Sequence, residues 1–294
     1  LTASHTGSLS GTDTAYSAFF KRLGICRVAT PSEFVELLKF LTIAGVPSGL
    51  RIAGFTCSGG GATMLADYAA PLELDFVQPS SQTKAELTQL LPHTATVTNP
   101  LDYTTPIWGD YERTLPVFKC LLEDGYDSAV LVQDYPAAGL DESKPNYRAD
   151  SDSFITACQT ASIPGAICST LPENLDAETR SHILQAGVAP MQGIETCMQA
   201  MSAAANYGKR RLALLANPPH PFRRTPIFGS NFQQLDEATA KTILADAGLN
   251  VPPFQKLPMA AAVSDKLDHI DIVYPVAVKI CSSDIGHKTE IGGV

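Results

Sequence analysis

Two kinds of segment alternate through the middle of the chain: short runs that are almost wholly apolar, and longer stretches with an apolar residue every three or four positions. The apolar runs at 51–57, 128–133 and 165–168 predict buried strands. The longer stretches predict helices near 62–70, 80–91, 110–124, 150–161, 176–186 and 193–207. This alternation predicts an α/β fold with a doubly wound parallel sheet and helices on both faces.

The residues before this alternation predict two helices, at 14–23 and 31–44, with a short strand at 26–28 between them. Thr30 and Glu33 have the spacing of a capping box at the start of the second helix. These elements are too few to form a domain alone. We therefore expect them to be the end of a separate α/β unit.

Prolines crowd the stretch 217–231, which excludes regular helix and predicts a linker between domains. A helical pattern follows at 235–244, with Asp236 as its N-cap. The apolar stretch 276–280 predicts a strand that carries Lys279. A lysine emerging from a buried strand needs an anionic partner; alternatively, Lys279 is an ordinary solvated strand lysine.

Composition narrows the class of protein. Of the 294 residues 45% are hydrophobic and 17% charged, as in ordinary globular proteins, and no apolar run reaches the length of a membrane span. The net charge of −9, without an extended basic patch, argues against a nucleic-acid binder and favours small-molecule partners. The seven cysteines are scattered and never form a CxxC pair, which predicts reduced thiols and a cytoplasmic protein.

Two stretches carry candidate chemistry. Gly59, Gly60 and Gly61 stand between a predicted strand and a predicted helix, a layout that lets backbone amides approach a phosphate or a coenzyme. Alternatively, these glycines only permit tight packing of the helix on the strand. His5 lies in a loop of serines and glycines before a helix, where N–H groups can surround an anion and a neutral imidazole can attack phosphorus. Its alternative role is that of an ordinary loop histidine.

The stretch Ser4-His5-Thr6-Gly7-Ser8-Leu9-Ser10-Gly11-Thr12-Asp13 closely resembles a motif of the ADP-forming (NDP-forming) acyl-CoA synthetases, relatives of succinyl-CoA synthetase. The resemblance reappears in 274–279 and in 287–294, and Thr98-Asn99-Pro100-Leu101-Asp102 resembles the family's N-P-x-D element. Asn and Asp beside a proline also suit any rigid turn.

The resemblance implies the roles of individual residues. His5 would be the phosphorylated histidine, and His287 the histidine that receives the phosphoryl group second. Lys279, Gly292 and Gly293 would contact nucleotide phosphates in an ATP-grasp domain, and no metal ligand is assigned. The implied reaction joins a carboxylic acid to CoA, with ATP and Mg²⁺ as cofactors.

The resemblance also implies a domain plan. Residues 1–48 would end a succinyl-CoA-ligase-like α/β domain, 49–210 would form a flavodoxin-like CoA-ligase domain, 211–230 a linker, and 231–294 the start of an ATP-grasp domain. Because the chain begins inside one motif and stops within another, we expect a fragment, inactive alone, of a longer homo-oligomeric enzyme. The competing hypothesis is a non-catalytic CoA- or nucleotide-binding module of a regulatory or acyltransferase-fused protein.

Overall fold

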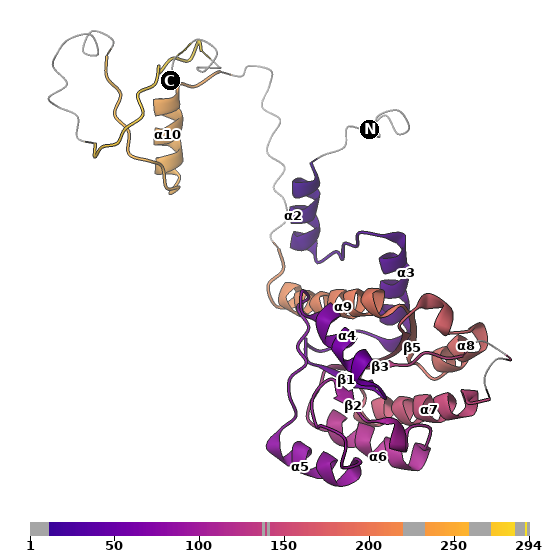
Figure 1. Ribbon diagram of the computed structural model, residues 1–294. Coiled ribbons are helices and arrows are strands. Elements are labelled where there is room, and N and C mark those ends of the chain that lie inside the picture. Colours follow the sequence, from indigo (N-terminus) through magenta and orange to yellow (C-terminus); the bar gives the residue numbers. More distant parts are fainter. Residues whose placement is uncertain are drawn as a thin grey trace. The chain divides into compact units, whose positions relative to one another are not determined.

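The computed structural model describes residues 12–136, 139, 142–219, 233–258, 272–285 and 292. The chain divides into two compact units, Leu1–His220 and Pro221–Val294. All strands of the described residues belong to the first unit (Figure 1). His5, His287 and Gly293, which the sequence proposes as site residues, lie outside the described residues.

The first unit is built on a five-stranded parallel sheet with the strand order β2-β1-β3-β4-β5. Its strands are β1 (Ile52–Thr56), β2 (Leu101–Asp102), β3 (Ser128–Val132), β4 (Gly165–Ser169) and β5 (Ala189–Gln192). The predicted doubly wound parallel sheet is confirmed, and its order is that of flavodoxin-like folds. The sequence pattern missed β2, which has two residues, and β5, which contains a proline.

Helices cover both faces of the sheet (Figure 1). They are α4 (Gly59–Ala69), α5 (Ser81–Leu90), α6 (Tyr111–Leu122), α7 (Lys144–Ala161), α8 (Ala177–Gln185) and α9 (Ile194–Ala216), with short 3₁₀ turns η2 (Thr105–Ile107) and η3 (Pro172–Asn174). Successive strand residues point to opposite faces. Phe55 therefore packs in the core under α5 to α8, whereas Ile52 packs in the core under α4 and α9.

The starts of α4 and α7 and the end of α9 differ from the prediction. α4 starts at Gly59, so the expected glycine turn is the first turn of the helix itself. α7 starts at Lys144, before the predicted residue 150. α9 continues beyond the predicted end at residue 207 to Ala216. Gly208 lies inside this helix at a close contact, since a Cβ there would lie 2.6 Å from the Pro47 carbonyl oxygen. The helix therefore includes residues 211–216, which were expected to lie in the linker.

The N-terminal helices are α2 (Asp13–Leu23) and α3 (Pro31–Lys39), and a π-helical turn, η1 (Phe40–Ala44), follows α3. Thr30 caps α3 as predicted, while the Glu33 carboxylate accepts from Ala29 N rather than from Thr30 N. The predicted strand at 26–28 is wrong, since these residues pair with no other strand. Leu37 and Phe40 are buried in the core with α9. α3 therefore packs on this sheet, although the sequence assigned it to another domain.

The second unit contains α10 (Glu237–Asp246), capped by Asp236 as predicted. The strand predicted at 276–280 is wrong: these residues form no strand, and Val278 is 82% exposed. A strand needs neighbours to pair with, and the described residues of this unit provide none.

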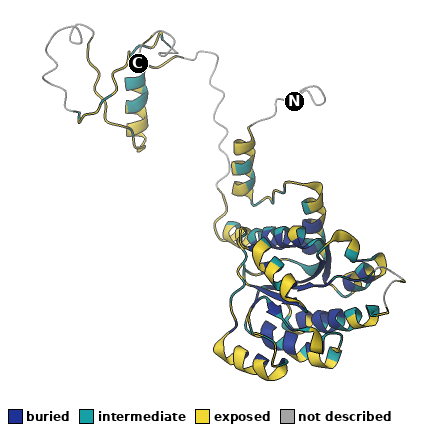
Figure 2. Ribbon diagram, viewed as in Figure 1, coloured by how far each residue is buried: buried dark blue, intermediate teal, exposed yellow. Residues whose placement is uncertain are grey.

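Burial is concentrated in the sheet and on the inner faces of its helices (Figure 2). All seven cysteines are free, and four of them are buried, as expected for reduced thiols. Among the described residues, no helix has the length and apolar character needed to cross a bilayer.

Candidate functional site

The N-terminus of α4 lies at the carboxyl edge of the sheet, directly after β1. The Ser58 side chain caps this helix by accepting from Gly61 N at 3.1 Å. Ser58, Gly59 and Gly60 are exposed, whereas Gly61 is buried. The first turn of a helix leaves N–H groups without partners in the helix, and these amides favour an anion.

The three positions of this turn differ in how much room they leave for a side chain. A Cβ at Gly61 would lie 2.4 Å from Thr56 Oγ1, so packing against β1 requires glycine there. At Gly59 and Gly60 the nearest atom to an added Cβ is 3.7 Å away, an ordinary contact distance. Packing therefore explains Gly61 alone. The other two keep the amides of the helix end uncovered by side chains.

The strand order places a topological switch point beside this helix end. β1 lies between β2 and β3. The chain runs from β1 to β2 on one side of it, and then returns to β3 on the other side and continues to β4 and β5. In open α/β sheets, ligands bind outside the carboxyl ends of the strands at such a point. Here the carboxyl edge carries Cys57 directly after β1, Asp102 at the end of β2 and Asp134 just after β3.

The Asn and the Asp of the N-P-x-D element have different surroundings. Asn99 is buried; its Oδ1 accepts from Gly54 N at 2.9 Å, and its Nδ2 donates to Ile52 O and Val77 O at 2.8 and 3.0 Å. Asn99 therefore fixes the backbone beside β1. Asp102 ends β2 at the carboxyl edge, opposite Thr56 in the register.

Two further carboxylates at this edge are held by protein donors. Both oxygens of Asp134 accept from Thr170, through its Oγ1, and Asn174 Nδ2 also donates to Asp134 at 3.1 Å. Asp134 therefore joins the loops after β3 and β4.

Asp150, on α7, is fully buried. It accepts from Tyr103 Oη at 2.7 Å and from Gly109 N at 2.8 Å. Burial raises the pKa of Asp150 to about 6, although the two donors act in the opposite direction. Neither Asp134 nor Asp150 is among the site residues expected from the sequence. The signal that could have found Asp134 is its position directly after a buried strand.

Cys57 lies at the same edge of the sheet, but its thiol is unreactive. Burial, followed by the negative charges of Asp150, Asp102 and Asp134, raises the pKa of Cys57 to about 11. A thiol that stays protonated at neutral pH is a poor nucleophile. This edge of the sheet therefore offers backbone amides and carboxylates rather than a reactive cysteine.

In the second unit, Lys279 Nζ lies 3.8 Å from Glu237 Oε1 on α10, and its side chain is 41% exposed. Its anionic partner in this structure is thus a carboxylate, and the lysine does not emerge from a buried strand as predicted. Gly292 has a positive φ of 67°, a backbone conformation that glycine adopts readily. Lys279 and Gly292 belong to the second unit, and the α4 site belongs to the first.

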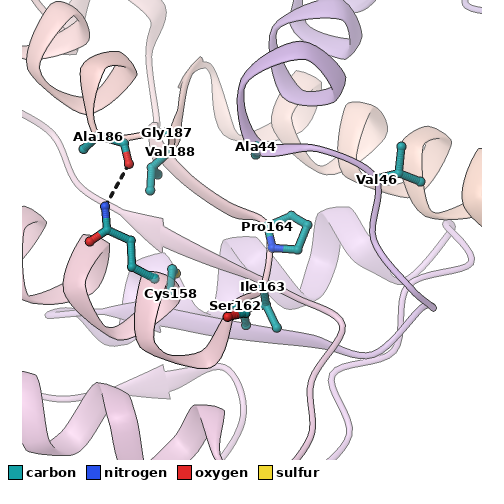
Figure 3. A pocket seen from close by; sticks show the side chains of 10 residues that line it. Ala44, Val46, Cys158, Ser162, Ile163, Pro164, Ala186, Gly187 and Val188 are labelled. Atoms are coloured by element: carbon teal, nitrogen blue, oxygen red, sulfur yellow. Dashed lines mark hydrogen bonds between the residues drawn. The ribbon is translucent and has the colours of Figure 1, made fainter.

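A cavity of about 340 Å³ lies away from the strand carboxyl ends, where β4 and β5 begin (Figure 3). Small and apolar residues dominate its lining, which consists of Ala44, Val46, Cys158, Gln159, Ser162, Ile163, Pro164, Ala186, Gly187 and Val188. Gln159 donates to Ala186 O across it at 3.0 Å. With no charged group in its lining, this cavity is not the candidate site. The described residues also contain no group of three or more His, Cys, Asp or Glu side chains that could hold a metal.

Known proteins resemble this chain in sequence. Residues 229–294 match the family model of an ATP-grasp domain. The chain is 28% identical to an ADP-forming acetate–CoA ligase of Methanocaldococcus jannaschii, over 99% of this chain and 42% of that protein. It is 37% identical to the alpha subunit of ADP-forming acetate–CoA ligase II of Pyrococcus furiosus, over 42% of this chain and 26% of that subunit.

A solved structure shares the fold. It is the dinucleotide-forming acetyl-coenzyme A synthetase 1 of Ca. Korarchaeum cryptofilum in complex with phosphate and ADP, which superimposes with a TM-score of 0.60 at 23% identity, over 74% of this chain and 46% of that one. The chain thus spans about two fifths of the length of the M. jannaschii ligase that it matches almost throughout. Along almost its whole length, the chain is therefore similar in sequence to ADP-forming acetate–CoA ligases, and it shares the fold of an acetyl-coenzyme A synthetase.

Proposed function

We propose that this chain is part of an ADP-forming acyl-CoA synthetase, which reversibly converts a carboxylic acid, CoA and ATP into acyl-CoA, ADP and phosphate. The observation that carries the proposal is the similarity to an ADP-forming acetate–CoA ligase along 99% of the chain. The open helix N-terminus of α4, at the switch point of the sheet, supports it from geometry. Further domains, on the same polypeptide or on another subunit, would supply the remainder of the enzyme.

The reaction proceeds through acyl phosphate and a phosphohistidine. His5 attacks the phosphorus of the acyl phosphate, while the amides of Gly59 and Gly60 bind the oxygens of the phosphoryl group. Preorganised N–H donors stabilise such charge without the reorganisation that water would need. Covalent capture on a histidine divides one difficult transfer into two easier steps.

In the second half of the reaction His287 takes the phosphoryl group and delivers it to ADP. Lys279, Gly292 and Gly293 bind the nucleotide phosphates, and Lys279 exchanges its carboxylate partner Glu237 for phosphate oxygens. Mg²⁺ would neutralise part of the nucleotide charge. We assign it no ligands, since the described residues form no metal cluster.

Phosphate labelling tests this assignment. The complete enzyme, incubated with acyl-CoA and ³²P-phosphate, should acquire an acid-labile and alkali-stable label, and His5→Ala should abolish it. Labelling that persists in His5→Ala would remove His5 from the mechanism. Loss of all labelling in the unmodified enzyme would favour the competing hypothesis of a non-catalytic binding module.

A further inference from the structure

The two edges of the sheet differ in length. β2 forms one edge with two residues, whereas β5 forms the other edge with four. An edge strand presents backbone N–H and C=O groups that can pair with a strand of another chain, and a very short edge strand limits such pairing. The β5 edge is therefore the one that needs a cover.

Two side chains of α3, which lies beside β5, bind backbone groups of this edge (Figure 1). Lys39 Nζ donates to Pro190 O at 2.8 Å, and Glu36 Oε2 accepts from Gln192 N at 3.1 Å. The two side chains also bind each other, with Lys39 Nζ 2.7 Å from Glu36 Oε1. Pro190 O and Gln192 N thus point away from β4. Because proline has no N–H, its place in β5 removes no ladder bond on the inner side.

This bonding pattern is that of a neighbouring parallel strand. In a parallel ladder, one residue of the added strand donates to the C=O before the residue opposite it and accepts from the N–H after that residue. Opposite Met191, these groups are Pro190 O and Gln192 N. Both are bound here by side chains of α3. The side-chain pair therefore takes the place of one residue of a sixth strand.

The burial of Glu36 supports this role. Glu36 is only 6% exposed, and a charge is costly to bury unless it is paired and hydrogen-bonded. An ion pair between residues three apart on a helix also forms on a solvated face, so the contact with Lys39 does not explain why the pair faces the strand. Leu37 and Phe40, buried in the core with α9, hold α3 in this position.

We propose that the Glu36–Lys39 pair covers the β5 edge and thereby prevents a second copy of this chain from pairing with it. A second copy is the occupant because a strand edge is self-complementary about a two-fold axis. In an antiparallel pair of two β5 strands, Gln192 N of each copy can donate to Pro190 O of the other. This role depends on the sheet and α3 alone, not on the proposed reaction.

The test uses the complete enzyme. Glu36→Ala with Lys39→Ala, the Ala/Ala variant, removes both hydrogen-bonding groups and keeps a high helix propensity. Glu36→Gln removes the ion pair but retains an acceptor for the strand. As a matched control, Arg148→Met with Asp152→Asn removes another helical ion pair, on α7. We measure hydrogen exchange at single amides, self-association by analytical ultracentrifugation over a range of protein concentrations, and the urea midpoint.

In the dilute Ala/Ala variant, the Gln192 N–H should exchange at least about 10-fold faster than in the wild type, because it loses its acceptor. The Met191 N–H, which by strand alternation points to β4, should be unchanged. The self-association constant of the Ala/Ala variant should exceed that of the wild type at least about 10-fold. Glu36→Gln and the α7 control should match the wild type in both measurements.

A further change tests whether the new association uses β5. Gln192→Pro, added to the Ala/Ala variant, removes the N–H that would pair with the second copy and should abolish the added association. At high concentration the Gln192 N–H of the Ala/Ala variant should become protected again, because the second copy supplies an acceptor.

Self-association of the Ala/Ala variant equal to that of the wild type would overturn the proposal, whatever the exchange rate. Association without renewed protection of the Gln192 N–H would also overturn it, because the copies would then meet through exposed apolar residues of α3 such as Phe34 and Val35. If the Ala/Ala variant does not fold, the decision falls to Glu36→Gln with Lys39→Met, which loses only the donor to Pro190 O. Wild-type association of that variant would count against the proposal.

Discussion

At the scale of single residues, Asp150 gives the structure a pH dependence of unusual sign. Its pKa lies near 6 in the fold, against an ordinary value of 3.8, because burial disfavours the charged form. The folded state therefore binds more protons than the unfolded state between these values, and stability falls as pH rises from about 4 to 6. Relative to the wild type, Asp150→Asn should gain roughly 2–3 kcal/mol between pH 4 and pH 7, as measured by urea unfolding at both.

Tyr103→Phe provides the matched test of that explanation. The Tyr103 hydroxyl donates to Asp150 and lowers its pKa. Removing this donor should therefore raise the pKa of Asp150, and with it the upper end of the pH range over which the stability falls. If this pH range is unchanged in Tyr103→Phe, another group is responsible for the pH dependence. The same follows if the difference in unfolding free energy between Asp150→Asn and the wild type does not vary with pH.

At the scale of elements, the first turn of α4 combines a packing requirement with an open end. Gly61→Ala should cost about 1–3 kcal/mol, because the new methyl group would meet Thr56 Oγ1 at 2.4 Å in the contact between α4 and β1. Gly60→Ala should be neutral or stabilising by up to about 1 kcal/mol, since it meets nothing closer than 3.7 Å and alanine favours helix. Urea unfolding of both variants measures the difference.

The double change Thr56→Ala with Gly61→Ala serves as the control on this element. If the conflict is with Thr56 Oγ1, alanine at position 56, which lacks that atom, should recover part of the stability, because the effects of neighbouring substitutions are not additive. Equal costs for alanine at Gly60 and Gly61 would contradict the packing explanation.

At the scale of the whole molecule, the two proposed phosphoryl carriers fall in different compact units, His5 in Leu1–His220 and His287 in Pro221–Val294. We propose that the phosphoryl group passes from one to the other by a rearrangement between discrete positions. In the complete enzyme, His287→Ala should retain His5 labelling from acyl-CoA and phosphate but lose ATP formation from ADP. Near-normal ATP synthesis in His287→Ala would mean that His5 serves ADP directly, and His5→Ala is the control that must lose both signals.

The sequence alone determined the parts of this protein that depend on local order. Apolar runs of strand length predicted β1, β3 and β4, and the caps at Thr30 and Asp236 were visible in the sequence because a cap needs only a side chain and a backbone N–H a few residues away. The motif around His5 also indicates a resemblance to the ADP-forming acyl-CoA synthetases.

Tertiary structure decided what depends on residues far apart in the chain. The stretch 276–280 reads as a strand but forms none, because strand formation depends on neighbours that its own sequence does not specify. Conversely, the two residues of β2 become a strand only by pairing with β1. That pairing brings Asp102 next to Gly59, although the two residues are 43 positions apart in the sequence (102 − 59). The burial that sets the pKa of Asp150 likewise comes from packing. Local sequence thus specified elements and motifs, while contacts across the sheet specified which side chains meet at the site.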